Sequence, residues 1–225
     1  MARDLNLIDA FAAIPTGNIS DAMAKLGLPS GVLVDGPRAI DIHQPRMAGY
    51  AFTIQQMPRH QTAEGKSLCK HLDVINSIAE AGDVLVIDVG DRKDVCTGGG
   101  MLALRAKVRG LRGLLANGCY RDIADVADEK FPLFCKGSTP TKSSPLLETV
   151  GINTNVVIGG VQIRPGDIVV GDDTGIVVIP VSEAEKVLSV ASRIQKVETR
   201  MTELILEGRD YKECRKLAEA EFPAV

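Results

Sequence analysis

The sequence predicts one domain of mixed α/β class, extending over residues 1–225, with a helical tail over about 182–225. A buried strand, a glycine-rich loop, a helix and a second buried strand follow one another between Gly82 and Gly118, as in α/β proteins. Short β-branched runs separated by turn residues then fill residues 156–179 and are typical of a compact barrel or sandwich. No Pro/Gly/Ser-rich linker divides the 225 residues.

The N-terminal segment is expected to form two helices. Residues Leu5–Ile14 are apolar on one face, and Pro15–Asn18 interrupt this pattern. Ser20 and Asp21 can cap a second short helix that runs through Lys25.

Strands joined by turns are expected between residues 31 and 57, most clearly at Tyr50–Gln55. A polar loop at Met57–Lys70 then leads into a helix over about Ser67–Ala81. The continuous apolar run Gly82–Asp88 predicts a strand buried on both faces.

A loop is expected at Val89–Gly100, a helix at Met101–Arg109, a second buried strand at Gly113–Gly118 and a short strand at Phe131–Cys135. Beyond the β-rich segment, apolar residues recur every three or four positions between Ser182 and Gly208, which predicts an amphipathic helix. The stripe comprises Val187, Val190, Ile194, Val197, Met201 and Leu204. We expect a stripe on a protruding helix to need a partner, which favours a homo-oligomer.

Composition excludes several classes of protein. The 26 Lys+Arg and 29 Asp+Glu give a net charge of −3, and aromatic residues make up only 4%, so nucleic acid is not an expected partner. No window approaches 18 uninterrupted apolar residues, and an acid at Asp4 precedes the first apolar run. We therefore expect neither a membrane span nor a secretory signal, and a cytoplasmic protein.

Cysteine and histidine usage points away from a zinc site. The five cysteines show no CxxC spacing, and His43, His60 and His71 show no HxH or HExxH spacing. Three histidines without a pattern are more simply ordinary surface or core residues than ligands. Any metal would have to be held by oxygen, which favours Mg²⁺ or Mn²⁺.

Two short segments could bind a ligand. The glycines before Met101 and Leu102 would leave backbone N–H groups at a helix N-terminus, either as an anion site or as a flexible hinge. Arg121 and Asp122 follow a buried strand, where an arginine fork and a carboxylate could face a ligand crevice. The simpler local interpretation of this pair is an ion pair at a helix N-terminus, to which Asp125 would add.

The spacing from Gly100 to Asp125 adds a longer pattern. Twenty residues separate Gly100 from Arg121-Asp122, and Asp125 follows, giving G-x20-R-D-x2-E/D. The chain resembles the proteins named regulator of ribonuclease activity A and the class II 4-hydroxy-4-methyl-2-oxoglutarate/4-carboxy-4-hydroxy-2-oxoadipate aldolases. The resemblance covers most of the chain and also takes in Thr16–Met23, Gly82–Asp88, Gly159–Val161, Pro165–Asp167 and Asp173–Pro180.

This resemblance implies an α/β/α sandwich around a β-barrel-like core, assembled as trimers or hexamers with active sites between subunits. It implies that Asp122 holds Mg²⁺ or Mn²⁺ largely through water, and that Arg121 binds the carboxylate and keto oxygen of a pyruvyl unit. The loop of Gly99 and Gly100, with the N–H groups of Met101 and Leu102, would bind the same carboxylate. The metal would act as a Lewis acid that stabilises the pyruvate enolate.

The dedicated aldolases follow a pattern that resembles D-x20-R-D. This chain departs from that pattern because Gly100 stands in place of its first aspartate. Asp125 can compensate by holding metal-bound water, and oxaloacetate decarboxylation, which needs no base for a large alcohol, becomes a plausible activity. We therefore expect a lyase that releases pyruvate from a 2-oxo acid, with Arg121, Asp122 and Asp125 as its catalytic residues.

The alternative is a non-catalytic regulator that binds a ribonuclease by protein–protein contact. The ribonuclease-inhibiting members can lack the aspartate after the arginine, so the presence of Asp122 favours the enzyme.

Three further features are weaker candidates. Cys119 could be a reactive thiol near a cation, although a small buried thiol is the simpler interpretation. Asp172 and Asp173 resemble a metal pair but fit a turn between strands. Glu198, on the C-terminal helix, is the candidate acid that reaches a neighbouring subunit's site, as the resemblance implies.

Overall fold

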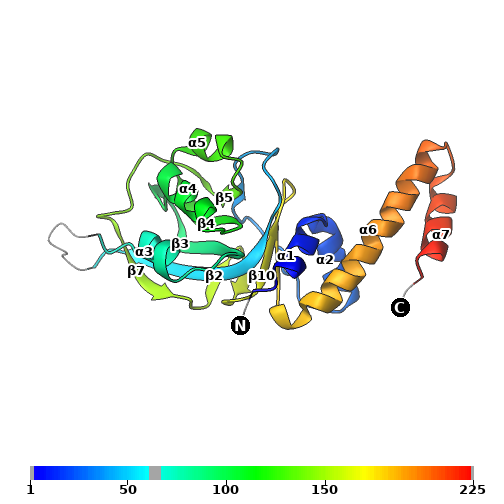
Figure 1. Cartoon of the computed structure of the whole chain (residues 1–225), viewed down its shortest axis with the longest axis horizontal. Helices are drawn as coiled ribbons and strands as arrows, with labels where there is room; N and C mark the ends of the chain where they lie inside the picture. Colours follow the sequence, from blue (N-terminus) through cyan, green and yellow to red (C-terminus); the bar gives the residue numbers. More distant parts are fainter. Residues whose placement is uncertain (1–2, 61–66, 224–225) are drawn as a thin grey trace.

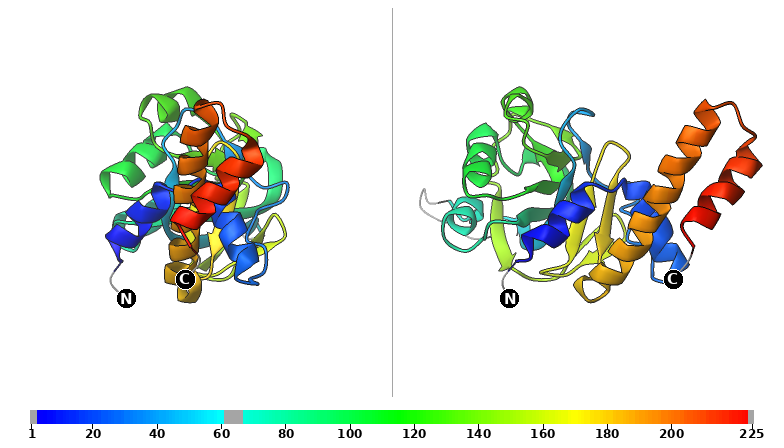
Figure 2. Two further views of the ribbon diagram at one scale, coloured as in Figure 1. Left: turned by 90° about the vertical axis from the view of Figure 1, so that its right-hand side faces the viewer. Right: turned by 45° about the vertical axis from the view of Figure 1, so that its right-hand side comes forward.

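The structure is a computed structural model that describes residues 3–60 and 67–223. Its strands form a nearly closed, barrel-like sheet with helices on two sides and a helical hairpin projecting at one end (Figure 1, Figure 2). The helices are α1 (Leu5–Ala12), α2 (Thr16–Lys25), α3 (His71–Ser77), α4 (Gly100–Val108), α5 (Ile123–Asp128), α6 (Ala184–Leu206) and α7 (Tyr211–Glu221), with a 3₁₀ turn at Val181–Glu183. The strands are β1 (Arg38–Ala39), β2 (Met47–Pro58), β3 (Asp83–Cys96), β4 (Gly113–Tyr120), β5 (Leu133–Cys135), β6 (Gly137–Ser138), β7 (Leu147–Ile152), β8 (Val156–Ile158), β9 (Val161–Ile163), β10 (Ile168–Gly171) and β11 (Ile176–Ile179).

The main sheet has the strand order β1-β5-β4-β3-β2-β10-β11, with β6 paired to β4 and β7 paired to β2. Strands β2 to β5 are parallel, and β1, β10 and β11 are antiparallel to their neighbours. The segment that leads into β1 connects the two ends of this order. The Leu33 N–H donates to the Ile176 carbonyl of β11 at 3.1 Å, and Arg38 pairs with Cys135 of β5.

Alternating side chains divide the sheet between the barrel interior and its outer surface, as the two-residue period of a strand requires. Along β2, Ala51 points inward while Tyr50 and Phe52 point outward. The interior contains Leu33, Met47, Ala51, Val84, Val86, Leu115, Phe134, Val156, Ile158, Ile163, Val169, Ile176 and Val178. Helices α3, α4 and α5 cover one outer face and α1, α2 and α6 cover another, which confirms the predicted α/β/α arrangement around a barrel-like core.

The second helix begins earlier than the sequence predicts. It starts at Thr16, so Ser20 and Asp21 lie inside it and do not cap it. The cap comes from the β10–β11 turn, because the Asp172 carboxylate accepts from the Thr16 N–H at 2.9 Å and from its hydroxyl at 2.7 Å. A partner 156 residues away leaves no local signal.

Strand β3 is also longer than predicted and continues through most of the expected loop at Val89–Gly100. Its second half is largely exposed and pairs with β4 through irregular register, so it lacks the apolar run that marks its first half. Strand β7, which pairs with β2, was not predicted. Helix α3 is shorter than the expected Ser67–Ala81, and part of the loop expected before it, residues 61–66, lies outside the described residues.

The apolar stripe of α6 is largely covered by the chain itself, contrary to the expectation that it needs a second copy. Val187 and Ile194 pack in the cluster formed with α1 and α2. Met201 and Leu204 pack against Cys214 and other residues of α7. The stripe therefore does not by itself require an oligomer. Among residues 3–60 and 67–223, no helix is long and apolar enough to cross a membrane.

Candidate active site

The glycine loop lies between the end of β3 and the start of α4, and the end of β4 holds it in place. The backbone N–H of Arg121 donates to the Gly98 carbonyl at 3.1 Å. The hydroxyl of Tyr120 donates to the Gly99 carbonyl at 3.2 Å. Tyr120 is fully buried, and burial raises the pKa of its phenol, so the hydroxyl remains a donor. The loop is thus fixed against β4, which favours the anion site over the flexible hinge.

Asp122 occupies the turn between β4 and α5 in a left-handed conformation, with φ 56° and ψ 40°. It is the N-cap residue of α5, yet its side chain makes no capping hydrogen bond there. Its Oδ2 atom instead accepts from the Gly100 N–H of α4 at 3.0 Å and lies 3.5 Å from Arg121 Nε. The carboxylate therefore sits at the positive end of the α4 dipole.

The side chains of Arg121, Asp122 and Asp125 limit the space at the two loop glycines. A Cβ at Gly99 would lie 2.9 Å from Arg121 Nε and would collide with Asp122 Oδ2, so a larger residue there would displace these side chains. A Cβ at Gly100 would lie 3.3 Å from Asp125 Oδ2 and 3.4 Å from the Asp122 Cβ atom. Asp122 and Asp125 therefore flank the position at which the dedicated aldolases are expected to carry an aspartate.

The helix start offers fewer free N–H groups than the sequence suggests. The Gly100 N–H is taken by Asp122, and the Leu102 N–H donates to the Gly99 carbonyl at 3.0 Å. Within the described part of the chain, the Met101 N–H has no acceptor. Of the two backbone donors expected to bind a substrate carboxylate, Met101 is the one left available.

An open cavity of about 460 Å³ lies beside this loop. It is lined by Arg121, Asp122, Ile123, Ser138, Thr139 and Pro140. Ser138 and Thr139 were not predicted as site residues, because the sequence shows them only as part of a polar surface loop. Pairing of β6 with β4, at Tyr120 and Ser138, brings them next to Arg121.

The oxygen atoms available at this site fit a hard divalent cation that is bound weakly. Asp122 and Asp125 supply carboxylate oxygens, and the Asp122 side chain is 41% exposed, which leaves room for water. In the described ranges, no three His, Cys, Asp or Glu side chains converge on a metal position. Mg²⁺ is commonly bound through one or two carboxylates with several retained waters, so these residues are compatible with it.

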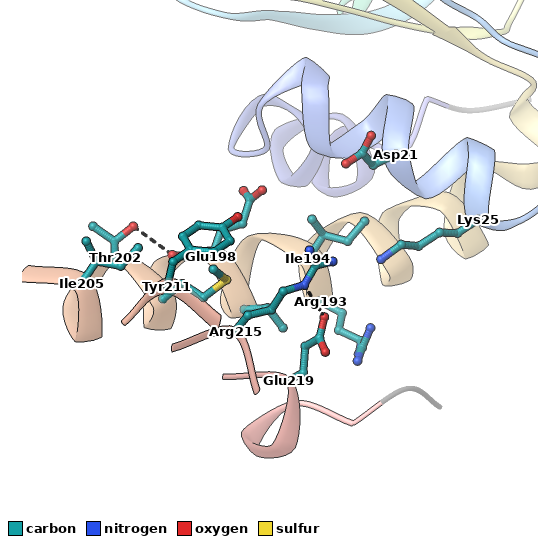
Figure 3. A pocket seen from close by; sticks show the side chains of 12 residues that line it. Asp21, Lys25, Arg193, Ile194, Glu198, Thr202, Ile205, Tyr211, Arg215 and Glu219 are labelled. Carbon is teal, nitrogen blue, oxygen red and sulfur yellow. Dashed lines mark hydrogen bonds and ion pairs between the residues drawn. The ribbon is translucent and has the colours of Figure 1, made fainter. Parts of the chain in front are cut away.

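Glu198 lies elsewhere in the chain. It lines a cavity of about 520 Å³ between α2, α6 and α7, together with Asp21, Lys25 and Arg193 (Figure 3). Its Oε2 atom accepts from the Asn18 amide at 2.8 Å. Helix α6 and helices α4 and α5 lie on different sides of the barrel (Figure 1). A role for Glu198 at the Arg121 site therefore requires a neighbouring subunit, and it stays a prediction.

The remaining candidates are structural. Cys119 is buried, its thiol donates to the Lys93 carbonyl at 3.3 Å, and burial raises its pKa. Asp172 Oδ1 accepts from the Thr174 and Gly175 N–H groups at 3.0 and 3.3 Å, as expected for a turn, and Asp173 is exposed. His43 and His60 are exposed.

His71 is buried, and its imidazole Nε2 has no hydrogen-bond partner among the described residues. Burial lowers the pKa of His71 from 6.5 to about 4. Between these values the unfolded chain binds more protons than the folded one. We therefore expect the free energy of unfolding to fall by about 2–3 kcal/mol as the pH drops from 6.5 to 4.

Urea denaturation at pH 7 and pH 4.5 measures this effect. His71→Leu should remove this part of the pH dependence, and the exposed control His43→Gln should retain it. Equal pH dependence in the wild type and His71→Leu would show that the imidazole is not responsible.

Comparison with known families gives one family match over most of the chain. The model described as RraA-like, Aldolase/RraA, matches residues 16–178. An uncharacterized protein of Methanocaldococcus jannaschii is 38% identical over 96% of both chains. A protein of Halalkalibacterium halodurans named "Putative 4-hydroxy-4-methyl-2-oxoglutarate aldolase" is 35% identical over 85% of both chains.

Solved structures share the fold. An uncharacterized protein from Pseudomonas syringae superimposes with a TM-score of 0.84 at 27% identity, over 95% of this chain and 94% of that one. RraAS2 of Streptomyces coelicolor, described as an unusual member of the RNase ES inhibitor RraA protein family, superimposes with a TM-score of 0.76 at 30% identity. This second match covers 88% of this chain and 97% of that one.

Proposed function

The chain belongs to the RraA-like (Aldolase/RraA) family, and we propose that it is a divalent-metal-dependent lyase that releases pyruvate from a 2-oxo acid. One observation carries the proposal: Arg121 and Asp122 line one open cavity beside the N-terminus of α4. A guanidinium, a carboxylate and a helix N-terminus together can accommodate an anionic substrate and a cation. The aldolase name of the Halalkalibacterium relative agrees with this chemistry.

Different residues of the site would bind the substrate, hold the metal ion and position the glycine loop. Arg121 would bind the substrate carboxylate and keto oxygen through its planar fork, and the Met101 N–H would add a backbone donor. Asp122 would hold Mg²⁺ or Mn²⁺ largely through water, and Asp125 would hold water bound to the ion. When bound, the ion supplies Lewis-acid stabilisation of the negative charge that develops on the 2-oxo group as the bond breaks. Tyr120 and Gly98 would keep the glycine loop in register with Arg121.

Two reactions fit this site. Aldol cleavage of 4-hydroxy-4-methyl-2-oxoglutarate and decarboxylation of oxaloacetate both release pyruvate and place the same negative charge on the 2-oxo group. The residue at position 100 affects which of the two reactions the site favours, because Gly100 replaces the aspartate expected in the dedicated aldolases. Decarboxylation needs no base for a substrate alcohol and therefore depends less on a carboxylate there.

Removal of the metal is expected to abolish pyruvate release from both substrates. The assay couples pyruvate to NADH oxidation by lactate dehydrogenase, first after chelation with EDTA and then after adding back excess Mg²⁺ or Mn²⁺. We expect chelation to lower the rate at least a hundredfold and metal to restore it. Full activity in EDTA would refute metal dependence. A rate with protein and metal that is no higher than the rate with metal alone, for both substrates, would refute the lyase.

The alternative function is a regulator that binds a ribonuclease. The observation that favours it is the 30% identity to RraAS2, whose description places it in an RNase ES inhibitor family. This function predicts a stable complex with a ribonuclease and no need for a divalent cation. A complex that forms equally well with Asp122→Asn, in a protein without lyase activity, would support it.

We also propose that the active assembly is a trimer or hexamer in which Glu198 reaches the Arg121 site of a neighbour. Within one chain, α6, which carries Glu198, lies on a different side of the barrel from α4 and α5 (Figure 1). The end of the α6–α7 hairpin exposes Leu206, which is 83% exposed, and Tyr211. Multi-angle light scattering measures the assembly, and a monomer mass would contradict it.

A further inference from the structure

A second cavity adjoins the one at Arg121. It has a volume of about 330 Å³, is lined by Arg38 and Lys136 among others, and shares Ile123 and Ser138 with the first cavity. The two adjoining cavities, together the groove, are lined by one arginine each, and both are lined by the half-buried side chain of Ile123. Two cationic side chains and a shared apolar one are complementary to a short carbon chain with an anion at each end.

The sheet sets the distance between the backbone positions of the two arginines. Arg38 of β1 pairs with Cys135 of β5, and after Lys136 the chain pairs with β4 at Tyr120 and Ser138. Arg38 and Arg121 thus flank the same short segment from opposite sides. Neighbouring strands lie about 4.8 Å apart, so β1, which carries Arg38, and β4, which ends one residue before Arg121, are roughly 10 Å apart. This separation is within the combined reach of two long side chains.

Arg38 is the cation in the second cavity that remains available to a ligand. Lys136 pairs with Asp91 at 3.0 Å, which neutralises its charge. Arg38 is exposed, and its Nη1 donates to the Thr174 carbonyl at 2.9 Å, which orients the guanidinium. Among the described residues no carboxylate lies within ion-pair distance of Arg38. A guanidinium held by a neutral carbonyl keeps its charge and several donors for an anion.

We propose that Arg38 binds the second carboxylate of a 2-oxo dicarboxylic acid whose 2-oxo carboxylate end lies at Arg121. This inference rests on the proposed function for the Arg121 end of the groove. It assigns a preference for dicarboxylates to a residue outside the G-x20-R-D-x2-E/D pattern.

The test is a binding comparison that needs no turnover. 2-Oxoglutarate and 2-oxopentanoate have the same chain length and differ only in a terminal carboxylate or methyl group. Isothermal titration calorimetry with excess Mg²⁺ gives the dissociation constant of each for wild type, Arg38→Met, Arg38→Lys and the remote control Arg209→Met. We expect the wild type and Arg209→Met to bind 2-oxoglutarate at least tenfold more tightly than 2-oxopentanoate.

Arg38→Met should lose this preference while its affinity for 2-oxopentanoate is unchanged, and Arg38→Lys should retain part of it. Equal weakening of both ligands by Arg38→Met, an unchanged preference, or no preference in the wild type would overturn the proposal. The pyruvate-release assay is independent of this result. Loss of the preference in Arg38→Met, in a protein that releases no pyruvate, would retain the carboxylate subsite and reject only the lyase.

Discussion

Replacing Asp122 with asparagine is expected to lower kcat/KM for pyruvate release by about a thousandfold without disturbing the fold. The expected loss comes from removing the negative charge that would hold the divalent cation. The fold should survive, because asparagine tolerates the left-handed conformation of residue 122 and its amide oxygen can still accept the Gly100 N–H bond. The thermal midpoint should therefore stay close to that of the wild type.

The matched control for this variant is Asp128→Asn. It makes the same change of charge on the same short helix, at an exposed residue outside the cavity. Mn²⁺ binding, followed by electron paramagnetic resonance, gives a readout that does not depend on turnover. Asp122→Asn should weaken it strongly and Asp128→Asn should not. Wild-type activity and Mn²⁺ affinity in Asp122→Asn would remove Asp122 from the site.

Arg121→Lys is expected to lower kcat/KM by about a hundred- to a thousandfold. Lysine keeps the positive charge but offers a single ammonium in place of the planar fork that can bind two oxygens at once. The backbone bond from residue 121 to the Gly98 carbonyl does not depend on the side chain, so the glycine loop should keep its position.

Steady-state kinetics with oxaloacetate separates the contributions to KM and kcat, and circular dichroism verifies the fold. Arg215→Lys is the matched control, because Arg215 lies on α7 in an exposed pair with Glu219. A kcat/KM within threefold of the wild type for Arg121→Lys would show that a simple charge suffices there. The bidentate role assigned to Arg121 would then be wrong.

Local sequence patterns were sufficient where an element packs by its own periodicity. The runs at Gly82–Asp88 and Gly113–Gly118 lie in strands β3 and β4, because strands covered on both faces are apolar throughout. The stripe on α6 likewise predicted a helix. Sequence patterns did not predict structure that depends on a partner distant in the chain. Examples are the start of α2 and the polar second half of β3.

The candidate site likewise contains residues that sequence patterns predicted and one residue that they could not place. Gly99, Gly100, Met101 and Leu102 were expected at a helix start after a strand, and Arg121 at the end of the next strand, where α/β folds bind ligands. The structure brings these residues together, and their catalytic roles stay predictions. Glu198 could not be placed from one chain, because its position relative to Arg121 depends on how subunits assemble.

Local patterns in the sequence were enough to predict the α/β class, the order of the principal elements and the spacing that brings an arginine and two carboxylates to a glycine loop. Three-dimensional contacts are needed to see that Asp122 caps α4 and not its own helix, and that Ser138 and Arg38 line cavities beside Arg121. The reason is that these contacts depend on the pairing of β4 with β6 and of β1 with β5. These strands are short and distant in sequence, and their register is set by packing of the whole sheet.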